Sequence, residues 1–378
     1  MKRRLFTPGP TPVPEDVLLL MAQPIQHHRL PAYEDIFMKA SQLLKKLFQT
    51  RNPVLTLTSS GTGAMEAAVC NLLSPGDKAV VVRGGKFGER WGEICESYGI
   101  SVIGIDIEWG RSVDPSTVAR TIDENPGVSA VFTTHSETST GALNDIEGIS
   151  KAIKGSGALM IVDGITGIGV HDFRFDEWGV DAAVTGSQKG LMIPPGLAFI
   201  ALSEKALEAA KTSKCPKYYF DLERYISSLG KKQNPWTPAI SLVVGLTRAL
   251  EMILEEGLQA TFKRHERLAG ATRAAAKALG LKLLPDVPSN VLTALWIPDS
   301  VDSKKFMNYI RNEMGVMVAG GQGHLKGKIF RIAHVGYFDD LDMLTAVAAM
   351  ERALIHCGYE VEPGAGLAAA HGELINSF

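Results

Sequence analysis

The sequence predicts an α/β protein with a large, mostly parallel sheet of seven strands and a smaller C-terminal α/β part. Short apolar runs alternate with amphipathic stretches from residue 54 to about 256, which is typical of a parallel sheet covered by helices on both faces. Two long helical patterns, at 240–256 and 261–278, then lead into the rest of the chain. We therefore expect three parts, namely an arm at 1–15, a large domain at 16–257 and a small domain at 258–378.

The predicted elements follow one another in a regular order. Residues 1–12 are too rich in proline and glycine for regular structure, and helices are expected at 13–22 and 33–48. Between these helices, His27 and His28 are expected in an exposed loop, or in a loop that reaches the active site of a partner subunit. The expected strands are 54–58, 79–83, 102–106, 130–134, 159–163, 182–185 and 198–202.

The composition favours an enzyme with small-molecule partners. The chain has 378 residues, of which 45% are hydrophobic, so it can bury a large core. Its net charge of −2, with acidic and basic residues mixed, argues against nucleic acid or an anionic membrane as a partner. No apolar run is long enough to span a bilayer. We expect no metal site, no disulfide and a cytoplasmic location, because the cysteines lie far apart at Cys70, Cys95, Cys215 and Cys357.

A lysine and an aspartate follow two of the predicted strands. Lys189 comes after the run 182–185 and stands among glycines, and Asp163 ends the run 158–162. An amine kept from water loses its charge, and the neutral amine attacks a carbonyl to form a Schiff base. An exposed loop lysine is the ordinary alternative, since lysine is almost never fully buried. At the carboxyl edge of one sheet, however, the pair matches what pyridoxal 5′-phosphate (PLP) needs, a carboxylate on the ring nitrogen and a lysine on the aldehyde.

Four motifs along the chain carry a resemblance to a known family. They are Thr7-Pro8-Gly9-Pro10, Val162-Asp163-Gly164, Thr185-Gly186-Ser187-Gln188-Lys189 and Phe330-Arg331-Ile332. With these motifs the chain resembles the class V aminotransferases of PLP fold type I, and most of all their alanine/serine–glyoxylate (or pyruvate) branch. The resemblance covers nearly the whole chain. It implies the PLP-dependent transferase fold type I, PLP as cofactor and a homodimer with shared active sites.

The first predicted strand leads directly into a helix through glycines and hydroxyl residues. Unpaired N–H groups and the positive end of a helix dipole there favour an anion such as phosphate. A dinucleotide fingerprint is the competing interpretation, but Glu66 stands where its third glycine belongs and Arg83 ends the next strand in place of an acid. The resemblance implies that Ser60, Gly61 and Thr62 hold the PLP phosphate.

The resemblance assigns further contacts around the cofactor. Phe87 stacks on the ring, where relatives often carry Trp; a core phenylalanine is the ordinary alternative. Thr138 touches the ring, while Ser187 and Gln188 add contacts to the phosphate and ring. Thr237 reaches the phosphate of the neighbouring subunit, although Asn234 stands where relatives carry a tyrosine. Gly9 lies near the substrate. His135 opens a His-x-Glu motif without a third metal ligand nearby, so a hydrogen bond within the fold is an alternative role.

Arg331 alternates with apolar residues along a predicted strand at 329–333. A guanidinium in that setting needs a planar anion, and a carboxylate supplies two charge-assisted hydrogen bonds. A structural salt bridge would satisfy this need as well. The resemblance implies that Arg331 binds the α-carboxylate of the substrate, with 320–323 forming a turn near it.

These residues predict a ping-pong aminotransferase in which alanine or serine gives its amino group to glyoxylate or pyruvate. Lys189 and Asp163 are the predicted catalytic residues. An aspartate-using enzyme remains an alternative, because Arg29, Lys326 or Lys328 could receive a second carboxylate.

Other members of the fold and other classes also compete. A cysteine desulfurase is disfavoured because no cysteine lies within 300–345. The incomplete glycine fingerprint argues against a nicotinamide dehydrogenase. A non-catalytic accessory subunit would have no physical need for Lys189, Asp163 and Arg331 together.

Overall fold

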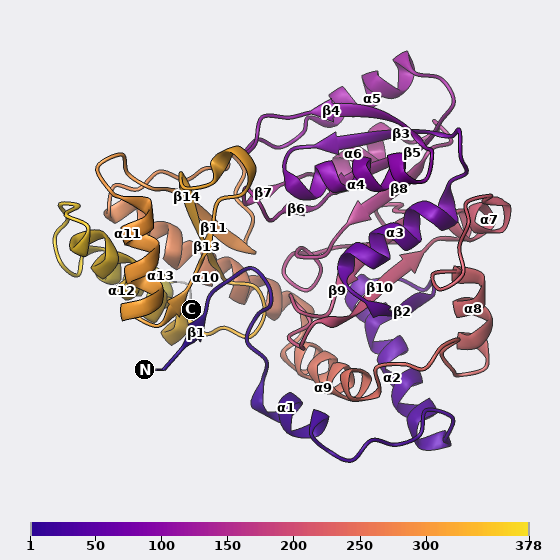
Figure 1. Cartoon of the computed structure of the whole chain (residues 1–378), viewed down its shortest axis with the longest axis horizontal. Coiled ribbons are helices and arrows are strands. Elements are labelled where there is room, and N and C mark those ends of the chain that lie inside the picture. The colour runs from indigo at the N-terminus through magenta and orange to yellow at the C-terminus, as the bar shows by residue number, and fades with distance from the viewer. Residues whose placement is uncertain (1, 377–378) are drawn as a thin grey trace.

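The computed structural model describes residues 2–376, so Met1, Ser377 and Phe378 of the predicted arm and small domain lie outside the described residues. The molecule has a large lobe around one broad sheet and a smaller lobe that carries both ends of the chain (Figure 1). Helix α9 ends at Glu256 and helix α10 begins at Leu258, next to the residue where the sequence places the domain boundary. The boundaries themselves remain a prediction.

The large sheet has seven strands in the order β2-β10-β9-β8-β5-β3-β4. All seven expected strands are present, and β10 runs antiparallel to both of its neighbours, β2 and β9. The remaining pairs are parallel, which confirms a mostly parallel sheet. The strands are β2 (Val54–Ser59), β3 (Lys78–Arg83), β4 (Ser101–Asp106), β5 (Val128–Thr134), β8 (Leu159–Asp163), β9 (Ala182–Gly186) and β10 (Gly196–Leu202).

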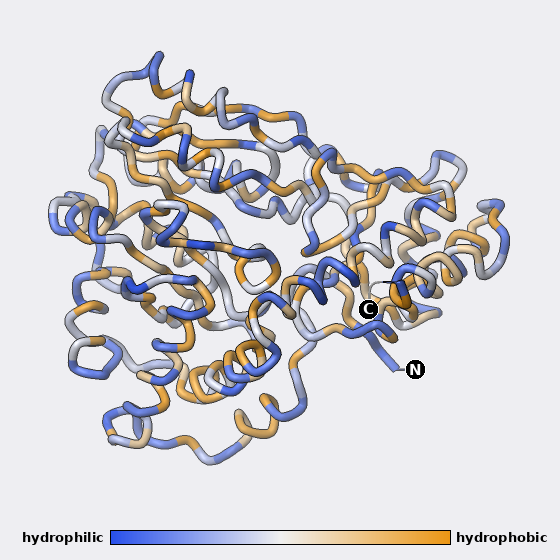
Figure 2. The backbone as a smooth tube through the Cα atoms, turned by 180° about the vertical axis from the view of Figure 1, so that it is seen from behind, coloured by the Kyte–Doolittle hydropathy of each residue, from blue (hydrophilic) through white to orange (hydrophobic). Residues whose placement is uncertain are grey.

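Helices cover both faces of this sheet because its strands are apolar on both sides. In β3, Val80 and Val82 join a buried cluster with α2 (Pro31–Phe48) and α9 (Ile240–Glu256), while Ala79 and Val81 join a second cluster with α3 (Gly61–Leu72) on the other face. Figure 2 shows the hydrophobic segments gathered inside the lobe and hydrophilic segments along its rim. The other helices of the lobe are α1 (Glu15–Met21), α4 (Lys86–Ser97), α5 (Pro115–Glu124), α6 (Ile146–Ala152), α7 (Glu204–Thr212) and α8 (Leu222–Gly230).

The small lobe has its own sheet, in the order β11-β14-β13, and its own buried cluster. Its long helices α10 and α13 pack together, and α12 packs against both. Its strands are β11 (Leu292–Trp296), β13 (Ala319–Gly320) and β14 (Ile329–Ala333), and its helices are α10 (Leu258–Ala278), α11 (Ser303–Asn308), α12 (Asp340–His356) and α13 (Ala365–Asn376). No helix of the described residues is long and apolar enough to cross a membrane.

The N-terminal arm departs from the sequence-based expectation in one respect. Residues Arg4–Leu5 form a short strand, β1, that pairs in parallel with β12 (Val316–Met317) of the small lobe. The prediction that residues 1–12 lack regular structure is therefore wrong at these two positions. Phe6 is buried in the small-lobe cluster and stacks on Phe338 at 5.2 Å, so an apolar anchor holds the strand in place.

Candidate active site

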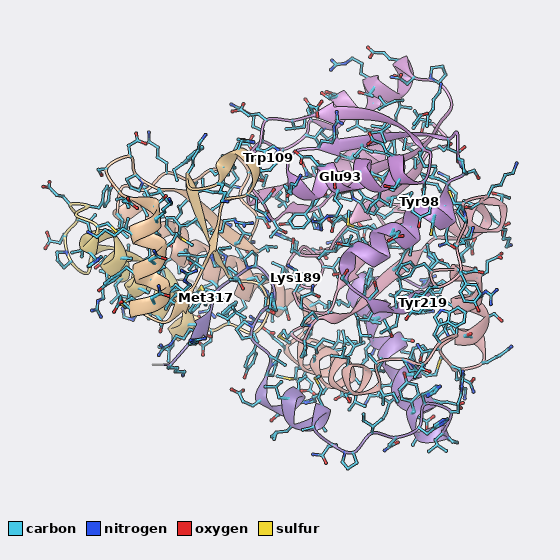
Figure 3. The ribbon with its side chains drawn as sticks, in the orientation of Figure 1. Glu93, Tyr98, Trp109, Lys189, Tyr219 and Met317 are labelled. Carbon is cyan, nitrogen blue, oxygen red and sulfur yellow. The ribbon has the colours of Figure 1, made fainter. Side chains whose placement is uncertain are left out.

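Asp163 and Lys189 lie on neighbouring strand ends, as the sequence predicts. Asp163 ends β8 and faces Val184 of β9 in the parallel register. Lys189 follows the end of β9 in the turn that returns the chain to β10. Figure 3 shows Lys189 at the junction between the two lobes. The topology therefore brings the acid and the amine to one edge of the sheet.

Asp163 is a buried carboxylate with a strongly perturbed pKa. Its Oδ1 accepts a hydrogen bond from the Ile165 backbone N–H at 2.8 Å, and this is the one hydrogen bond found for its side chain among residues 2–376. Burial raises the pKa of Asp163 to about 7, because the carboxylate loses its hydration. A cationic N–H partner at Oδ2 would restore the ionised form, and the ring nitrogen of PLP in its protonated form is such a partner.

Lys189 has the opposite perturbation. The pKa of Lys189 is lowered to about 8, mainly by burial. The charge of Asp163 raises this pKa, and the charges of Arg331 and Arg90 lower it. A side chain with this pKa is partly unprotonated near neutral pH, which a carbonyl-attacking amine requires. The Nζ atom donates a hydrogen bond to the Pro8 carbonyl at 2.7 Å.

The N-terminal arm closes over this lysine. Gly9 has a φ of 144°, and a Cβ added there would lie 2.1 Å from Lys189 Nζ, so the position excludes any larger residue. Thr11 Oγ1 donates a hydrogen bond to the Lys189 carbonyl at 3.2 Å. The structure thus brings Gly9 next to the predicted catalytic lysine, although 180 residues separate them in the chain.

The N-terminus of α3 offers free donors. Ser60 is the N-cap residue of α3, is exposed, and makes no side-chain capping hydrogen bond. The first N–H groups of a helix have no partner within the helix, and its dipole favours an anion there. A Cβ on Gly61 would lie 2.6 Å from Ile165 Cδ1, so glycine at this position lets the α3 backbone lie close to Ile165, two residues after Asp163. Ser60, Gly61 and Thr62 are therefore well placed for a phosphate.

A buried glutamate that sequence reasoning missed holds Phe87 in place. Glu137 accepts hydrogen bonds from the backbone N–H groups of Phe87 at 3.2 Å, Gly88 at 3.0 Å and Ser139 at 3.1 Å. The Ser139 hydroxyl donates to the same carboxylate. Phe87 lies in the first turn of α4, so this carboxylate caps the helix and sets the position of the aromatic ring. The His-x-Glu motif is the available signal, but its spacing suggests a metal site rather than a helix cap.

Arg331 is a buried guanidinium whose observed partners are backbone carbonyls. Nη1 donates to Thr138 O at 2.6 Å, and Nη2 and Nε donate to Gly320 O at 2.6 and 3.1 Å. No acid forms a salt bridge with it among the described residues, so the structural salt bridge is not seen. Burial lowers the pKa of Arg331 to about 10. A buried charge without an acid favours an anionic ligand, and Thr138 is tied to the arginine through its carbonyl.

The three remaining predicted cofactor contacts are Ser187, Gln188 and Thr237. The Ser187 hydroxyl is engaged in the turn, since it donates to Pro194 O at 2.8 Å and accepts from Leu197 N at 3.2 Å. Gln188 is partly exposed beside it. Thr237 is exposed and precedes the first residue of α9 by three positions.

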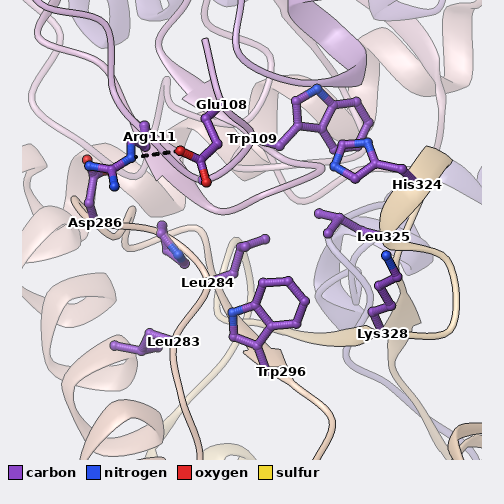
Figure 4. A pocket seen from close by; sticks show the side chains of 12 residues that line it. Glu108, Trp109, Arg111, Leu283, Leu284, Asp286, Trp296, His324, Leu325 and Lys328 are labelled. Carbon is purple, nitrogen blue, oxygen red and sulfur yellow. Dashed lines mark hydrogen bonds and ion pairs between the residues drawn. The ribbon is translucent and has the colours of Figure 1, made fainter.

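The candidates for a second carboxylate differ in their surroundings. Arg29 donates hydrogen bonds to the Gln233 side chain and the Asn234 carbonyl. Lys326 is exposed. Lys328 lines a cleft of about 520 Å³ that contains none of the predicted cofactor or substrate residues. In this cleft Trp109 packs on His324 at 4.6 Å and faces Trp296 across the opening (Figure 4).

The histidines singled out in the sequence lie in two different settings. His135 is buried against the rings of His171, Phe173 and Trp178. Burial lowers the pKa of His135 to about 4, so it is neutral at physiological pH. His27 is exposed and His28 is half-buried, and their two rings stack on each other. Among the described residues, no three His, Cys, Asp or Glu side chains cluster as metal ligands would.

The side chains at this sheet edge fit PLP. Asp163 has a buried oxygen for a ring N–H, Lys189 has an amine with a lowered pKa, and Phe87 offers an aromatic face held by Glu137. The α3 N-terminus leaves donors for the phosphate, while Arg331 has no acidic partner among the residues described. The ring nitrogen, the aldehyde, the ring face and the phosphate of PLP, together with an amino-acid carboxylate, thus each have a candidate partner in this chain.

Comparisons with known proteins agree with this fit. The chain is 46% identical over 376 residues to the small subunit of a soluble hydrogenase from Synechococcus sp. (strain PCC 6716), covering 98% of this chain and 97% of that protein. It is 38% identical to L-aspartate–glyoxylate aminotransferase from Paracoccus denitrificans (97% and 94% covered). It is 37% identical to serine–glyoxylate aminotransferase from Methylorubrum extorquens (99% and 96% covered).

A solved structure and a family model extend the agreement to the fold. The crystal structure of ureidoglycine–glyoxylate aminotransferase from Bacillus subtilis superposes with a TM-score of 0.94 at 32% identity, covering 100% of this chain and 99% of that one. The model of the aminotransferase class-V family matches residues 5–332, a stretch that includes every residue of the candidate site. The chain belongs to the class V aminotransferase family, whose members use PLP.

Proposed function

We propose that the protein is a PLP-dependent aminotransferase that moves the amino group of a small amino acid, alanine or serine, to glyoxylate or pyruvate by a ping-pong mechanism. The observation that carries the proposal is the pairing of Lys189, whose pKa lies near 8, with the buried carboxylate of Asp163 at one sheet edge. Relatives named for glyoxylate as acceptor support the choice of 2-oxo acid.

Each residue has a distinct task in this reaction. PLP would supply an electron-withdrawing ring that weakens the Cα–H bond of the substrate amino acid. Asp163 holds a proton on the ring nitrogen by remaining ionised against it. Lys189, once its amine is free, takes the proton from the substrate Cα and is positioned for this by the Pro8 carbonyl. Phe87 would cover the ring face, and the α3 N-terminus with Ser60 would hold the phosphate.

Arg331 orients the substrate. Its guanidinium is fixed by Thr138 O and Gly320 O, so the remaining N–H groups can bind the α-carboxylate without a further rearrangement. A single arginine of this kind favours substrates with one carboxylate. An aspartate donor would need a second cation, and Arg29 is the candidate if a partner subunit brings it near. Comparing kcat/KM for serine, alanine and aspartate with glyoxylate distinguishes the two alternatives.

One observation bears on the alternative of a non-catalytic accessory subunit: the 46% identical relative is named as a subunit of a soluble hydrogenase. That name describes the relative and says nothing of this chain's chemistry. The perturbed pKa values of Lys189 and Asp163 and the buried Arg331 are costly features that a purely structural subunit would not need. Transamination by the purified chain alone would decide in favour of the enzyme.

The proposal includes a homodimer with shared active sites, located in the cytoplasm. Helix α1 exposes three consecutive leucines, Leu18, Leu19 and Leu20, and a partner subunit would cover this apolar surface. Thr237 is exposed, as expected of a residue that serves the neighbouring site. The cysteines are all unpaired, which suits a reducing compartment.

The visible absorption of the purified protein tests the proposal. A yellow protein whose band shifts on addition of alanine, and in which borohydride fixes the cofactor on the peptide containing Lys189, supports it. Lys189→Ala should abolish turnover and borohydride labelling, while Lys211→Ala, on the surface of α7, should leave both unchanged. A colourless protein that neither takes up PLP nor is labelled would overturn the enzyme assignment.

A further inference from the structure

Arg90 is a cation at the edge of the candidate site to which none of the roles above applies. It lies on α4 one turn after Phe87, so both side chains project from the same face of the helix. Its guanidinium carbon lies 4.9 Å from the centre of the Phe87 ring. Its Nη1 atom donates a hydrogen bond to Thr62 Oγ1 at 3.1 Å. Arg90 therefore lies between the aromatic residue and the N-terminus of α3.

The charge of Arg90 is not balanced within the chain. Among residues 2–376 no Asp or Glu forms a salt bridge with it, and the Thr62 hydroxyl that it contacts is neutral. Arg264, which is also partly buried, does pair with an acid, Glu256, at 2.7 Å. The positive charge of Arg90 lowers the pKa values of both Asp163 and Lys189, so its field reaches the centre of the site. A partly buried guanidinium without an acid favours an anionic ligand.

Two anionic groups would bind in this site, the substrate α-carboxylate and the cofactor phosphate, and they would bind at different places. The substrate α-carboxylate is matched by Arg331, which is held at Thr138 and Gly320 on the small-lobe side. The phosphate is matched by the N-terminus of α3, where Arg90 already touches Thr62. A phosphate monoester carries a charge of roughly −1.5 to −2 at pH 7. A helix N-terminus supplies only about +0.5 of charge. The dipole alone leaves most of the phosphate charge uncompensated.

We propose that Arg90 is a phosphate ligand of the cofactor, acting with Ser60, Gly61 and Thr62. The guanidinium supplies the full positive charge that the helix end lacks, and its planar donors suit phosphate oxygens. The hydrogen bond to Thr62 keeps the side chain aimed at the helix end before the cofactor arrives. This assignment rests on the proposed PLP-dependent function and adds to it the residue that selects a phosphorylated cofactor.

The test compares two probes that differ only in the phosphate. Apoenzyme of the wild type and of Arg90→Gln is titrated with PLP and with pyridoxal, and the dissociation constants are read from cofactor absorbance. Loss of a charge-assisted contact should weaken PLP binding roughly 10- to 100-fold. Pyridoxal has the same ring and aldehyde, so its binding should change less than about twofold. Arg90→Lys keeps the charge and should recover part of the difference.

Lys86→Gln is the matched control. Lys86 lies on the same helix but pairs with Glu89, so its loss should change neither dissociation constant. Equal weakening of PLP and pyridoxal in both Arg90 variants would mean that Arg90 only positions Phe87 and Thr62, and this would overturn the proposal. Unchanged PLP binding would overturn it as well. A wild type that binds neither probe would instead contradict the proposed function itself.

Discussion

At the scale of single residues, the site depends on two groups whose pKa values are shifted toward neutral pH by burial. In water, aspartate is ionised and lysine is protonated at neutral pH. In this fold the pKa of Asp163 rises to about 7 and that of Lys189 falls to about 8. Both groups therefore titrate close to the working pH, where small changes in their surroundings decide their state.

The lowered pKa of Lys189 predicts how its reactivity depends on pH. The neutral amine attacks the cofactor aldehyde, so the rate at which apoenzyme takes up PLP should rise with pH and level off above about 8. An unperturbed lysine would keep gaining reactivity up to about 10.4. Stopped-flow absorbance between about pH 6 and 10 measures this, with a free lysine derivative correcting for the titration of PLP. A midpoint near the ordinary value would show that the amine is hydrated and that burial does not tune it.

Replacing Asp163 by Asn separates cofactor binding from chemistry. The amide keeps the size and hydrogen-bonding ability of the side chain but cannot stabilise a protonated ring nitrogen, so PLP should still bind while kcat falls on the order of 10²-fold or more. Single-turnover absorbance measures both quantities. The control is Asp145→Asn, because Asp145 is an exposed N-cap of α6 and Asn serves equally well there. Near-normal turnover of Asp163→Asn would mean that another group keeps the ring nitrogen protonated.

At the scale of elements, the N-terminus of α4 depends on Glu137. A carboxylate offers two acceptor oxygens to the N–H groups of Phe87, Gly88 and Ser139, whereas a glutamine turns one of them into a donor. Glu137→Gln should therefore lower the free energy of unfolding by about 1–3 kcal/mol. It should also displace Phe87 and weaken both PLP and pyridoxal, in contrast to a loss at Arg90.

Urea denaturation and the two cofactor titrations measure these effects. Glu147→Gln provides the control, since Glu147 forms a surface ion pair with Lys151 and its loss should cost less than about 1 kcal/mol. If Glu137→Gln were as stable as the wild type and bound both probes normally, the carboxylate would have no positioning role.

At the scale of the whole molecule, the exposed apolar surface of α1 predicts a dimer. Leu19 is 65% exposed in the single chain and lies between two further exposed leucines. Leu19→Glu should place a charge in the subunit interface, shift the sedimentation coefficient toward that of a monomer, and reduce activity, because Thr237 would no longer reach a neighbouring site. Leu341→Glu, at a leucine of α12 that is 71% exposed, should leave the dimer intact. A wild type that sediments as a fully active monomer would refute the shared site.

Most strands of the large lobe can be predicted from the local pattern of apolar residues in the sequence. Parallel strands are apolar on both faces, so β8 and β9 can be recognised in the sequence as short runs of apolar residues. Because the two strands are parallel, the residues at their carboxyl ends lie at the same edge of the sheet. Strand ends of this kind are enough to single out Asp163 and Lys189 in the sequence. The family resemblance adds Ser60, Gly61, Thr62 and Arg331 as predictions. In the structure the first three lie at the N-terminus of α3, and Arg331 has no acidic partner among the described residues.

What the sequence by itself determined is thus the fold class, the strands and the chemical pair at the sheet edge, because periodicity and strand ends are local properties. Only the tertiary structure decided that Glu137 caps α4, that Lys189 donates a hydrogen bond to the Pro8 carbonyl, and that Arg90 reaches Thr62. It likewise decided that Arg4 and Leu5 form a strand, since their partner, Val316–Met317, lies at the far end of the chain. Such contacts depend on how distant segments pack against one another, and a burial that shifts a pKa exists only once they have done so.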